Sequence, residues 1–125
     1  MQMAPCIYIV LVMHKVMLPI NSRAFRRFNL EEVIYLKAWG NYTFLIKREG
    51  RKILLSVLLK QIEDKLRKKG FYRLSRSYLI NLNHVEEYYP RQECRVVMSD
   101  GTSIEIPRRK KKVFREIMEE RYTHL

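Results

Sequence analysis

The amino-acid sequence predicts one domain made mainly of β-strands, with two amphipathic helices. Short runs of β-branched and aromatic residues alternate with turn-forming residues along most of the chain, which is typical of strands. Two other segments place apolar residues three and four positions apart, which is the period of a helix. The chain has 125 residues, 47% of them hydrophobic, and no linker rich in proline, glycine or serine. This length and composition suit a single domain with a substantial core.

The N-terminal segment is apolar only over Cys6–Met13, whereas a membrane-spanning helix needs about twenty residues. It has no basic N-terminal region and no Ala-x-Ala cleavage site, so we do not expect a signal peptide. Its β-branched residues suggest a strand or a hydrophobic tail. Alternatively, translation begins at Met13 and residues 1–12 are an upstream extension. We therefore assign residues 1–14 to an N-terminal extension or extra strand, and expect a protein that starts at Met13 to fold and bind normally.

The first half of the domain is predicted to contain five strands joined by short turns. Gly40-Asn41 interrupts one apolar run, and Glu49-Gly50 is placed to form a two-residue hairpin turn. In the strand between them, Tyr42, Phe44 and Ile46 should share one face because side chains alternate along a strand. The expected strands are 15–19, 23–28, 33–38, 42–47 and 52–55, with a turn at 29–32.

The first helix is expected over residues 57–69. Ser56 is a good N-cap residue, and Gly70 supplies the left-handed residue that commonly ends a helix. Between them the charged residues leave one apolar stripe, which we interpret as a face packed against the core. The residues of this stripe are Leu59, Ile62 and Leu66.

The second half continues with strands and ends in a second helix. Ser99-Asp100-Gly101 lies between two apolar runs, which is a strong hairpin signal. The remaining extended segments are 71–74, 77–82, 85–89, 94–98 and 102–106. The last helix is expected over 110–121, with an apolar stripe of Val113, Phe114, Ile117 and Met118. We place the domain at 15–121 and a short tail at 122–125.

The net charge is strongly positive, at +12 with an isoelectric point of about 10.0. Charge of this size repels itself in the folded state, so we expect an anionic partner. Nucleic acid, an anionic membrane and an acidic protein all fit, and we favour nucleic acid. Many of the cations fall in two clusters, each at the end of a strand-like run, and such residues belong on the surface. The clusters are Arg73–Leu82 and Ile104–Lys112.

The sequence gives no indication of enzyme or metal chemistry. Most of the acidic residues occur as adjacent doublets, which do not share a helix face, and we find no spacing that pairs two of them for acid–base catalysis. The glycines are isolated turn residues rather than a phosphate-binding loop. Two cysteines without a Cys-x-x-Cys pair and three distant histidines make no zinc site. We therefore expect no catalytic residues, metal, cofactor or small-molecule substrate, and interpret the cysteines as small buried residues of a cytoplasmic protein.

The sequence also lacks the common nucleic-acid readers, since the two helices are too far apart for a helix-turn-helix and no aromatic, glycine-rich RNP run occurs. Instead, three blocks in this order and spacing resemble the LytTR family of bacterial DNA-binding domains. The resemblance covers nearly the whole chain, from about Lys15 to about Met118. The blocks are Leu30–Tyr42, Leu58–Leu82 and Ser99–Arg109.

The resemblance implies an elongated stack of small antiparallel sheets with flanking helices. It also implies a transcription regulator of the bacterial cytoplasm that inserts loops into successive major grooves of double-stranded DNA and bends the duplex. Family members commonly bind direct-repeat sites as paired protomers, so a homodimer on DNA is expected. By their matching positions, three loops would carry the contacts: Gly40–Tyr42, Ser75-Arg76 and Arg108-Arg109.

The residues expected to contact DNA lie in and beside these loops. Arg76 and Arg108 have the forked donors suited to guanine or phosphate. The lysines at 110–112 suit phosphate as point charges, although a solvated helix start would also explain them. Asn41 can read an adenine edge, but turn formation explains it equally well. The full set is Asn41, Tyr42, Ser75, Arg76, Ser77, Arg108, Arg109, Lys110 and Lys111.

The sequence departs from the family pattern at two positions. Ser75 stands where the family usually has histidine, so the base contact there is expected to be lost or to move to Arg76. Pro107 stands where the family usually has serine. Only about fourteen residues precede the matching region, so we expect a stand-alone regulator with no receiver domain and no phosphorylation within this chain. Two other functions stay open: a basic RNA- or ribosome-associated β-domain, and a regulator tethered to a membrane or protein partner through Cys6–Met13.

Overall fold

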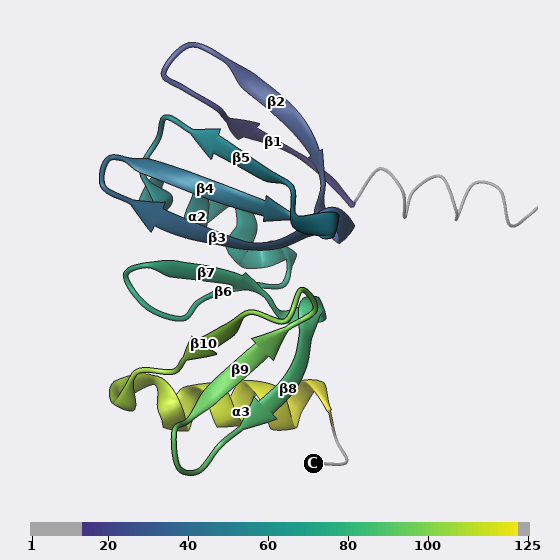
Figure 1. Cartoon of the computed structure of the whole chain (residues 1–125). Coiled ribbons are helices and arrows are strands. Elements are labelled where there is room, and N and C mark those ends of the chain that lie inside the picture. The colour runs from purple at the N-terminus through teal and green to yellow at the C-terminus, as the bar shows by residue number, and fades with distance from the viewer. Residues whose placement is uncertain (1–13, 123–125) are drawn as a thin grey trace, which may run out of the picture.

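The computed structural model describes residues 14–122, and the strands of this region form three antiparallel sheets of two, five and three strands. The sheets are stacked one above another, with the two-stranded sheet at one end and the three-stranded sheet at the other (Figure 1). The expected mainly β fold, with small antiparallel sheets and two helices, is therefore confirmed for this part of the chain. The expectations for residues 1–13 lie outside the described residues.

Each of the expected strands is present, with ends that shift by no more than two residues. The two-stranded sheet is a hairpin of β1 (Lys15–Pro19) and β2 (Phe25–Asn29). The five-stranded sheet has the order β5-β4-β3-β7-β6, and the three-stranded sheet has the order β10-β9-β8. These strands are β3 (Val33–Trp39), β4 (Tyr42–Lys47), β5 (Lys52–Leu55), β6 (Phe71–Arg73), β7 (Tyr78–Asn81), β8 (Val85–Tyr89), β9 (Arg95–Met98) and β10 (Ser103–Glu105).

The first helix, α2 (Leu59–Leu66), begins two residues later than the sequence predicts. The expected N-cap was wrong, because Leu58 rather than Ser56 precedes the first turn. The N–H of Leu58 donates to Oε1 of Gln61 at 2.8 Å, which satisfies the helix start. Ser56 is held elsewhere, since its N–H donates to the carbonyl oxygen of Ile20 at 2.8 Å. A tighter 3-10 turn carries the segment on to residue 69.

The second helix, α3 (Lys111–Arg121), starts one residue after the expected position. Phe114 and Met118 are buried as expected, but Val113 is exposed, so its assignment to the apolar stripe was wrong. The sheet covers only one side of this helix, and Val113 lies outside the covered strip. The glycine expected to end the first helical segment, Gly70, does so with a left-handed φ of 88°.

The turn between β4 and β5 also differs from the expected two-residue hairpin. The N–H of Lys47 donates to the carbonyl oxygen of Arg51 at 2.7 Å, which encloses three residues instead of two. Within it, Glu49 and Gly50 have left-handed φ values of 65° and 73°. The chain therefore reverses through two left-handed residues, and Arg48 joins the turn rather than pairing across it.

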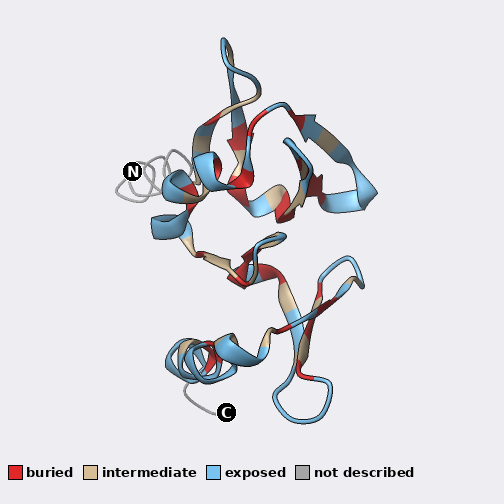
Figure 2. Ribbon diagram, turned by 90° about the vertical axis from the view of Figure 1, so that its left-hand side faces the viewer, coloured by how far each residue is buried: buried red, intermediate tan, exposed pale blue. Residues whose placement is uncertain are grey.

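The five-stranded sheet is buried on both faces, and this arrangement creates two cores (Figure 2). One face packs against α2 and the β1–β2 hairpin around Leu36 and Leu45. The other face packs against α3 and the three-stranded sheet around Tyr35 and Phe114. Because both faces are covered, β3 begins with four consecutive buried residues and does not alternate. This central sheet holds the two ends of the stack in a fixed relation.

No helix among residues 14–122 is long and apolar enough to cross a membrane. Within the same residues, no group of three or more histidine, cysteine, aspartate or glutamate side chains is arranged to hold a metal ion. Cys94 is a buried free thiol, as expected.

Candidate nucleic-acid interface

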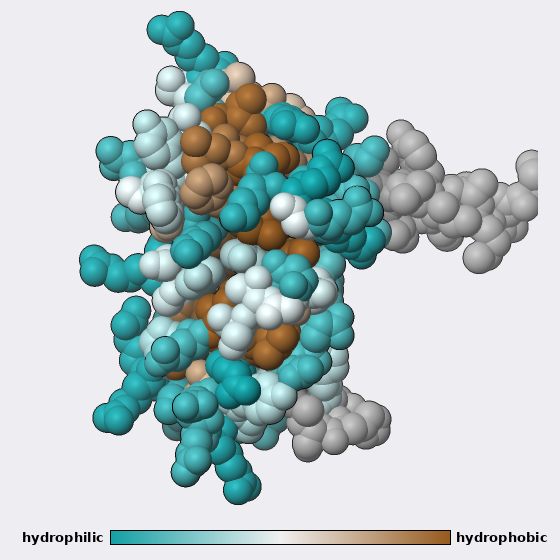
Figure 3. Space-filling view, viewed as in Figure 1, coloured by the Kyte–Doolittle hydropathy of each residue, from teal (hydrophilic) through white to brown (hydrophobic). Residues whose placement is uncertain are grey.

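The three loops expected to contact DNA lie along one edge of the molecule, on the left in Figure 1. They are the β3–β4 turn at residues 40–41, the β6–β7 loop at residues 74–77, and the connection from β10 to α3. Lys37 pairs with Tyr78, and the N–H of Ala38 donates to the carbonyl oxygen of Ser77 at 2.8 Å, so the first two loops are neighbours. Figure 2 shows this edge to be largely exposed, and Figure 3 shows hydrophilic side chains projecting from it.

The first loop is the tight turn between β3 and β4. Gly40 has a left-handed φ of 57°, which glycine adopts without strain, and the exposed Asn41 completes the turn. Trp39 and Tyr42 flank the turn as a cross-strand pair and are 59% and 46% exposed. The Trp39 ring meets the Phe44 ring edge-on, with centroids 5.8 Å apart. Sequence reasoning missed Trp39, whose signal was a large aromatic residue directly before a turn expected at the DNA.

The second loop carries Ser75, Arg76 and Ser77, and Arg73 at the end of β6 holds its shape. Nε of Arg73 donates to the carbonyl oxygen of Ser75 at 2.8 Å, and Nη2 donates to that of Arg76 at 2.8 Å. Nη1 of Arg73 donates to Oε1 of Glu63 on α2 at 2.6 Å. Ser75 is half-buried, whereas Arg76 and Ser77 are exposed. Arg73 therefore holds the loop backbone through these two carbonyl groups, and the Arg76 side chain stays exposed to solvent.

This arrangement corrects the expectation that the whole first basic cluster is exposed. The side chains of Arg73 and Glu63 are only 23% and 18% exposed, because the ion pair joins β6 to α2. Burial alone would raise the pKa of Glu63. The hydrogen bonds and positive charges of Arg73 and Arg67 outweigh burial and hold this pKa below its ordinary value of 4.5. Glu63 therefore stays ionised at neutral pH and keeps Arg73 in place.

We expect the Glu63–Arg73 pair to make stability depend on acid pH. The lowered pKa means that the stabilisation is complete above about 4.5 and is lost as the pH falls through the folded-state pKa. The measurement is urea unfolding of the wild type and of Glu63→Gln at about pH 7 and about pH 3. The stability difference between the two proteins should shrink at the lower pH. An equal difference at both values would show that Glu63 carries no pKa shift.

The third region is a single 3-10 turn, Arg108–Lys110, that leads into α3. Arg108 and Arg109 are exposed, and so is Lys111 in the first turn of the helix. Lys110 differs from them, because it is half-buried and its Nζ lies 5.4 Å from the centroid of the Tyr72 ring. Of the two lysines predicted to contact DNA, Lys111 is therefore the freer to reach a phosphate.

Positive charge is concentrated where α3 is least suited to it. The first turn of this helix contains no acidic residue, and the turn before it is Arg-Arg-Lys. The positive end of the helix dipole lies at the N-terminus, where anions stabilise and cations destabilise. A merely solvated helix start would gain stability from acidic residues at these positions. The absence of such residues from this turn favours the phosphate-binding interpretation of the cluster.

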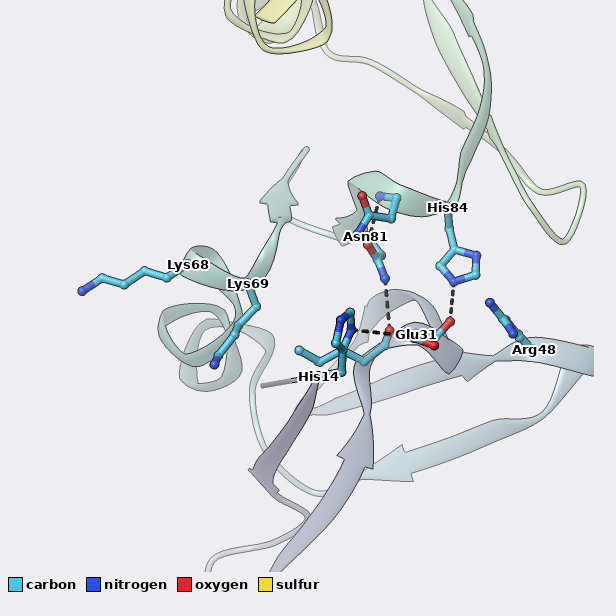
Figure 4. A pocket seen from close by; sticks show the side chains of 9 residues that line it. His14, Glu31, Arg48, Lys68, Lys69, Asn81 and His84 are labelled. Atoms are coloured by element: carbon cyan, nitrogen blue, oxygen red, sulfur yellow. Dashed lines mark hydrogen bonds and ion pairs between the residues drawn. The ribbon is translucent and has the colours of Figure 1, made fainter. Parts of the chain in front are cut away.

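A polar joint connects the two larger sheets on the side of the stack where β3 begins and β7 ends, away from the three loops (Figure 4). Nε2–H of His84 donates to the carbonyl oxygen of Glu31 at 2.7 Å, and its Nδ1 lies 2.6 Å from Oγ of Ser99. Nδ2 of Asn81 donates to the carbonyl oxygen of Val33 at 2.9 Å. A cavity of about 420 Å³ lies beside the joint, and its basic lining residues include Arg48, Lys68 and Lys69. His84 therefore ties the turn after β7 to the turn before β3 and to the β9–β10 turn.

The region that contains the three loops is similar to known proteins in sequence and in structure. The sequence pattern of the LytTr DNA-binding domain matches residues 23–119. Two proteins named sensory transduction protein LytT, from Bacillus cereus and Bacillus anthracis, are 27% and 28% identical over 109 residues. These matches cover 85% of this chain and 43% of each relative, so the chain spans less than half of their length. A solved LytTr DNA-binding domain from Bacillus cereus has the same fold, with a TM-score of 0.67 at 23% identity, covering 84% of this chain and 96% of that one.

Proposed function

Because this chain belongs to the LytTR family of DNA-binding domains, we propose that it binds double-stranded DNA sequence-specifically and regulates transcription. The observation that carries this proposal is the alignment of three exposed loops along one edge, two of them on the five-stranded sheet and the third between the three-stranded sheet and α3 (Figure 1). An edge of this kind can follow one side of a duplex and meet its major groove more than once. Family membership is consistent with a binding role rather than an enzymatic one.

In this proposal some loop residues recognise bases and others bind phosphates. Arg76 and Arg108 would read guanine edges, because each has an exposed guanidinium whose two donors match O6 and N7. Asn41 would read an adenine edge beside them, and Lys111 would bind phosphate and fix the register. Neutralising the cations at the start of α3 by phosphate would also remove their repulsion with the helix dipole.

The arrangement on the target is a further part of the proposal. We propose direct-repeat sites occupied by paired protomers, with the duplex bent so that successive grooves reach successive loops. The setting proposed is the cytoplasm of a bacterium, which agrees with the Bacillus origin of the relatives and with the free thiol of Cys94.

The first test is the dependence of binding on salt and on the kind of nucleic acid. If about five phosphates are neutralised, log K against log salt should have a slope of about −4 to −5 on a duplex. Fluorescence anisotropy with labelled double-stranded DNA, single-stranded DNA and double-stranded RNA measures this slope and the preference. A flat salt response, or equal affinity for the single strand, would contradict duplex binding. Tighter binding to RNA would favour the RNA- or ribosome-associated alternative.

Trp39 should report DNA binding directly. It is the single tryptophan of the chain and is exposed beside Asn41 on the edge proposed to face the duplex. Contact with bases or sugars should therefore change both the intensity and the wavelength of its emission. The measurement is a fluorescence titration with unlabelled duplex, with saturation followed independently by anisotropy. An unchanged spectrum at saturation would mean that the β3–β4 turn does not approach the DNA.

A further inference from the structure

We propose that the β1–β2 hairpin supplies a fourth DNA contact, in which Arg23 and Arg26 bind phosphates on the flank of the recognised site. This inference rests on the proposed function and extends its footprint. The loop between the strands, residues 20–24, lies at the top of the same side of the molecule as the other three loops, above the segment that joins β5 to α2 (Figure 1). The family match begins at residue 23, so β1 and residues 20–22 of this loop lie outside it, whereas Arg23 and Arg26 lie within it.

Hydrogen bonds hold the shape of the loop between β1 and β2. Oδ1 of Asn21 accepts hydrogen bonds from the N–H groups of Arg23 and Ala24, both at 2.8 Å. The N–H of Ile20 donates to the carbonyl oxygen of Ala24 at 3.0 Å and closes the loop. The carbonyl oxygen of Ile20 accepts from the N–H of Ser56 at 2.8 Å, which ties the loop to the segment between β5 and α2. A loop held in this way loses little conformational entropy on binding.

The two arginines are available to an anion. Both are exposed, and no carboxylate within residues 14–122 forms an ion pair with either of them. The guanidinium of Arg26 lies over the Phe28 ring, 5.3 Å from its centroid. Stacking on an aromatic face restrains the side chain while its N–H donors stay free in the plane of the guanidinium. This combination suits phosphate, which accepts forked donors.

The two faces of the hairpin are not equivalent. Arg26 pairs with Leu18 across the sheet and shares the face that turns towards the five-stranded sheet, whereas Arg27 pairs with Met17 on the other face. Arg26 therefore lies on the same face of the hairpin as the buried Leu18 and Phe28. The order of loops along the edge places the hairpin contact beyond the bases read near Asn41, and farthest from those read by Arg108.

The test compares Arg23→Ala and Arg26→Ala with a matched control, Arg51→Ala. Arg51 is also an exposed arginine, but it lies at the opposite end of β4 and β5 from the β3–β4 turn. The probe is the duplex selected in vitro by the wild-type protein, extended by one helical turn of about 10 base pairs on each side. A second probe lacks the extension beyond the bases that depend on Asn41. Melting temperatures confirm that each variant folds, as expected for exposed side chains.

On the extended duplex, each hairpin variant should bind about five- to tenfold more weakly at about 0.1 M salt, with a salt slope smaller by about 0.9. On the shortened duplex both variants should match the wild type, because their phosphates are missing. If Arg23→Ala and Arg26→Ala behave like Arg51→Ala on both duplexes, the hairpin is not a DNA contact, although the proposed function stands. If the wild type binds no duplex in a salt-dependent manner, both the proposed function and the hairpin contact are overturned.

Discussion

Replacing Arg73 with alanine should lower the free energy of unfolding by about 2–3 kcal/mol and should also weaken binding to the selected DNA site. The variant loses the hydrogen bonds to Glu63, Ser75 and Arg76. Glu63 keeps only the exposed Arg67 as a partner for its largely buried carboxylate. The β6–β7 loop then samples other conformations, so more conformational entropy is lost when Arg76 is fixed against a base. Urea unfolding and anisotropy titration measure the two losses separately.

Two controls separate stability from loop geometry. Arg67→Ala removes the exposed partner of Glu63 and should cost only about 0–1 kcal/mol. Arg73→Lys keeps a charge near Glu63 but cannot fork to two backbone carbonyls, so it should recover part of the stability and little of the affinity. If Arg73→Ala binds the site as tightly as the wild type under conditions where both are folded, the loop does not depend on Arg73.

Arg76→Ala and Arg108→Ala should each weaken binding to the preferred site by about 1–3 kcal/mol and relax selectivity at one base pair. The reason is that a forked guanidinium on guanine has no equivalent partner on the other bases. Lys111→Ala should instead weaken binding to all duplexes about equally and reduce the salt slope by about one. Affinities on the selected site and on a scrambled duplex, at two salt concentrations, distinguish these patterns.

Equal losses for all three variants on both duplexes would contradict this division of roles. In that case both arginines would be backbone contacts. Specificity would then have to come from Asn41, Tyr42 or the sequence-dependent shape of the duplex.

The elements of the fold were predictable because their signals are local. Turn residues and apolar periodicity indicated the strands and the two helices that residues 14–122 contain. The errors arose where a distant contact decides the outcome. Ser56 has the side chain of an N-cap residue, but its backbone is bonded to Ile20 and the helix begins later. Val113 fits a helical stripe, but the covering sheet does not reach it.

The candidate site was predictable only in part, for the same physical reason. The resemblance supplied the loop residues, but their alignment on one edge depends on the register of β3 with β7, which pairs Lys37 with Tyr78. Arg73 is indistinguishable in sequence from its exposed neighbours, and only its distance to Glu63 reveals that it holds the loop. His84 bonds to Glu31, which is more than fifty residues away in the sequence, so no short motif could predict this contact.

In vitro selection from random double-stranded DNA tests the proposed reading of successive grooves most directly. Loops that enter neighbouring major grooves from one side should enrich two or more short conserved blocks, with centres about 10 base pairs apart. Arg76→Ala and Arg108→Ala should each erase conservation in a different block. Enrichment of a single uninterrupted block, or no enrichment over the starting pool, would contradict the proposal that the loops read successive grooves.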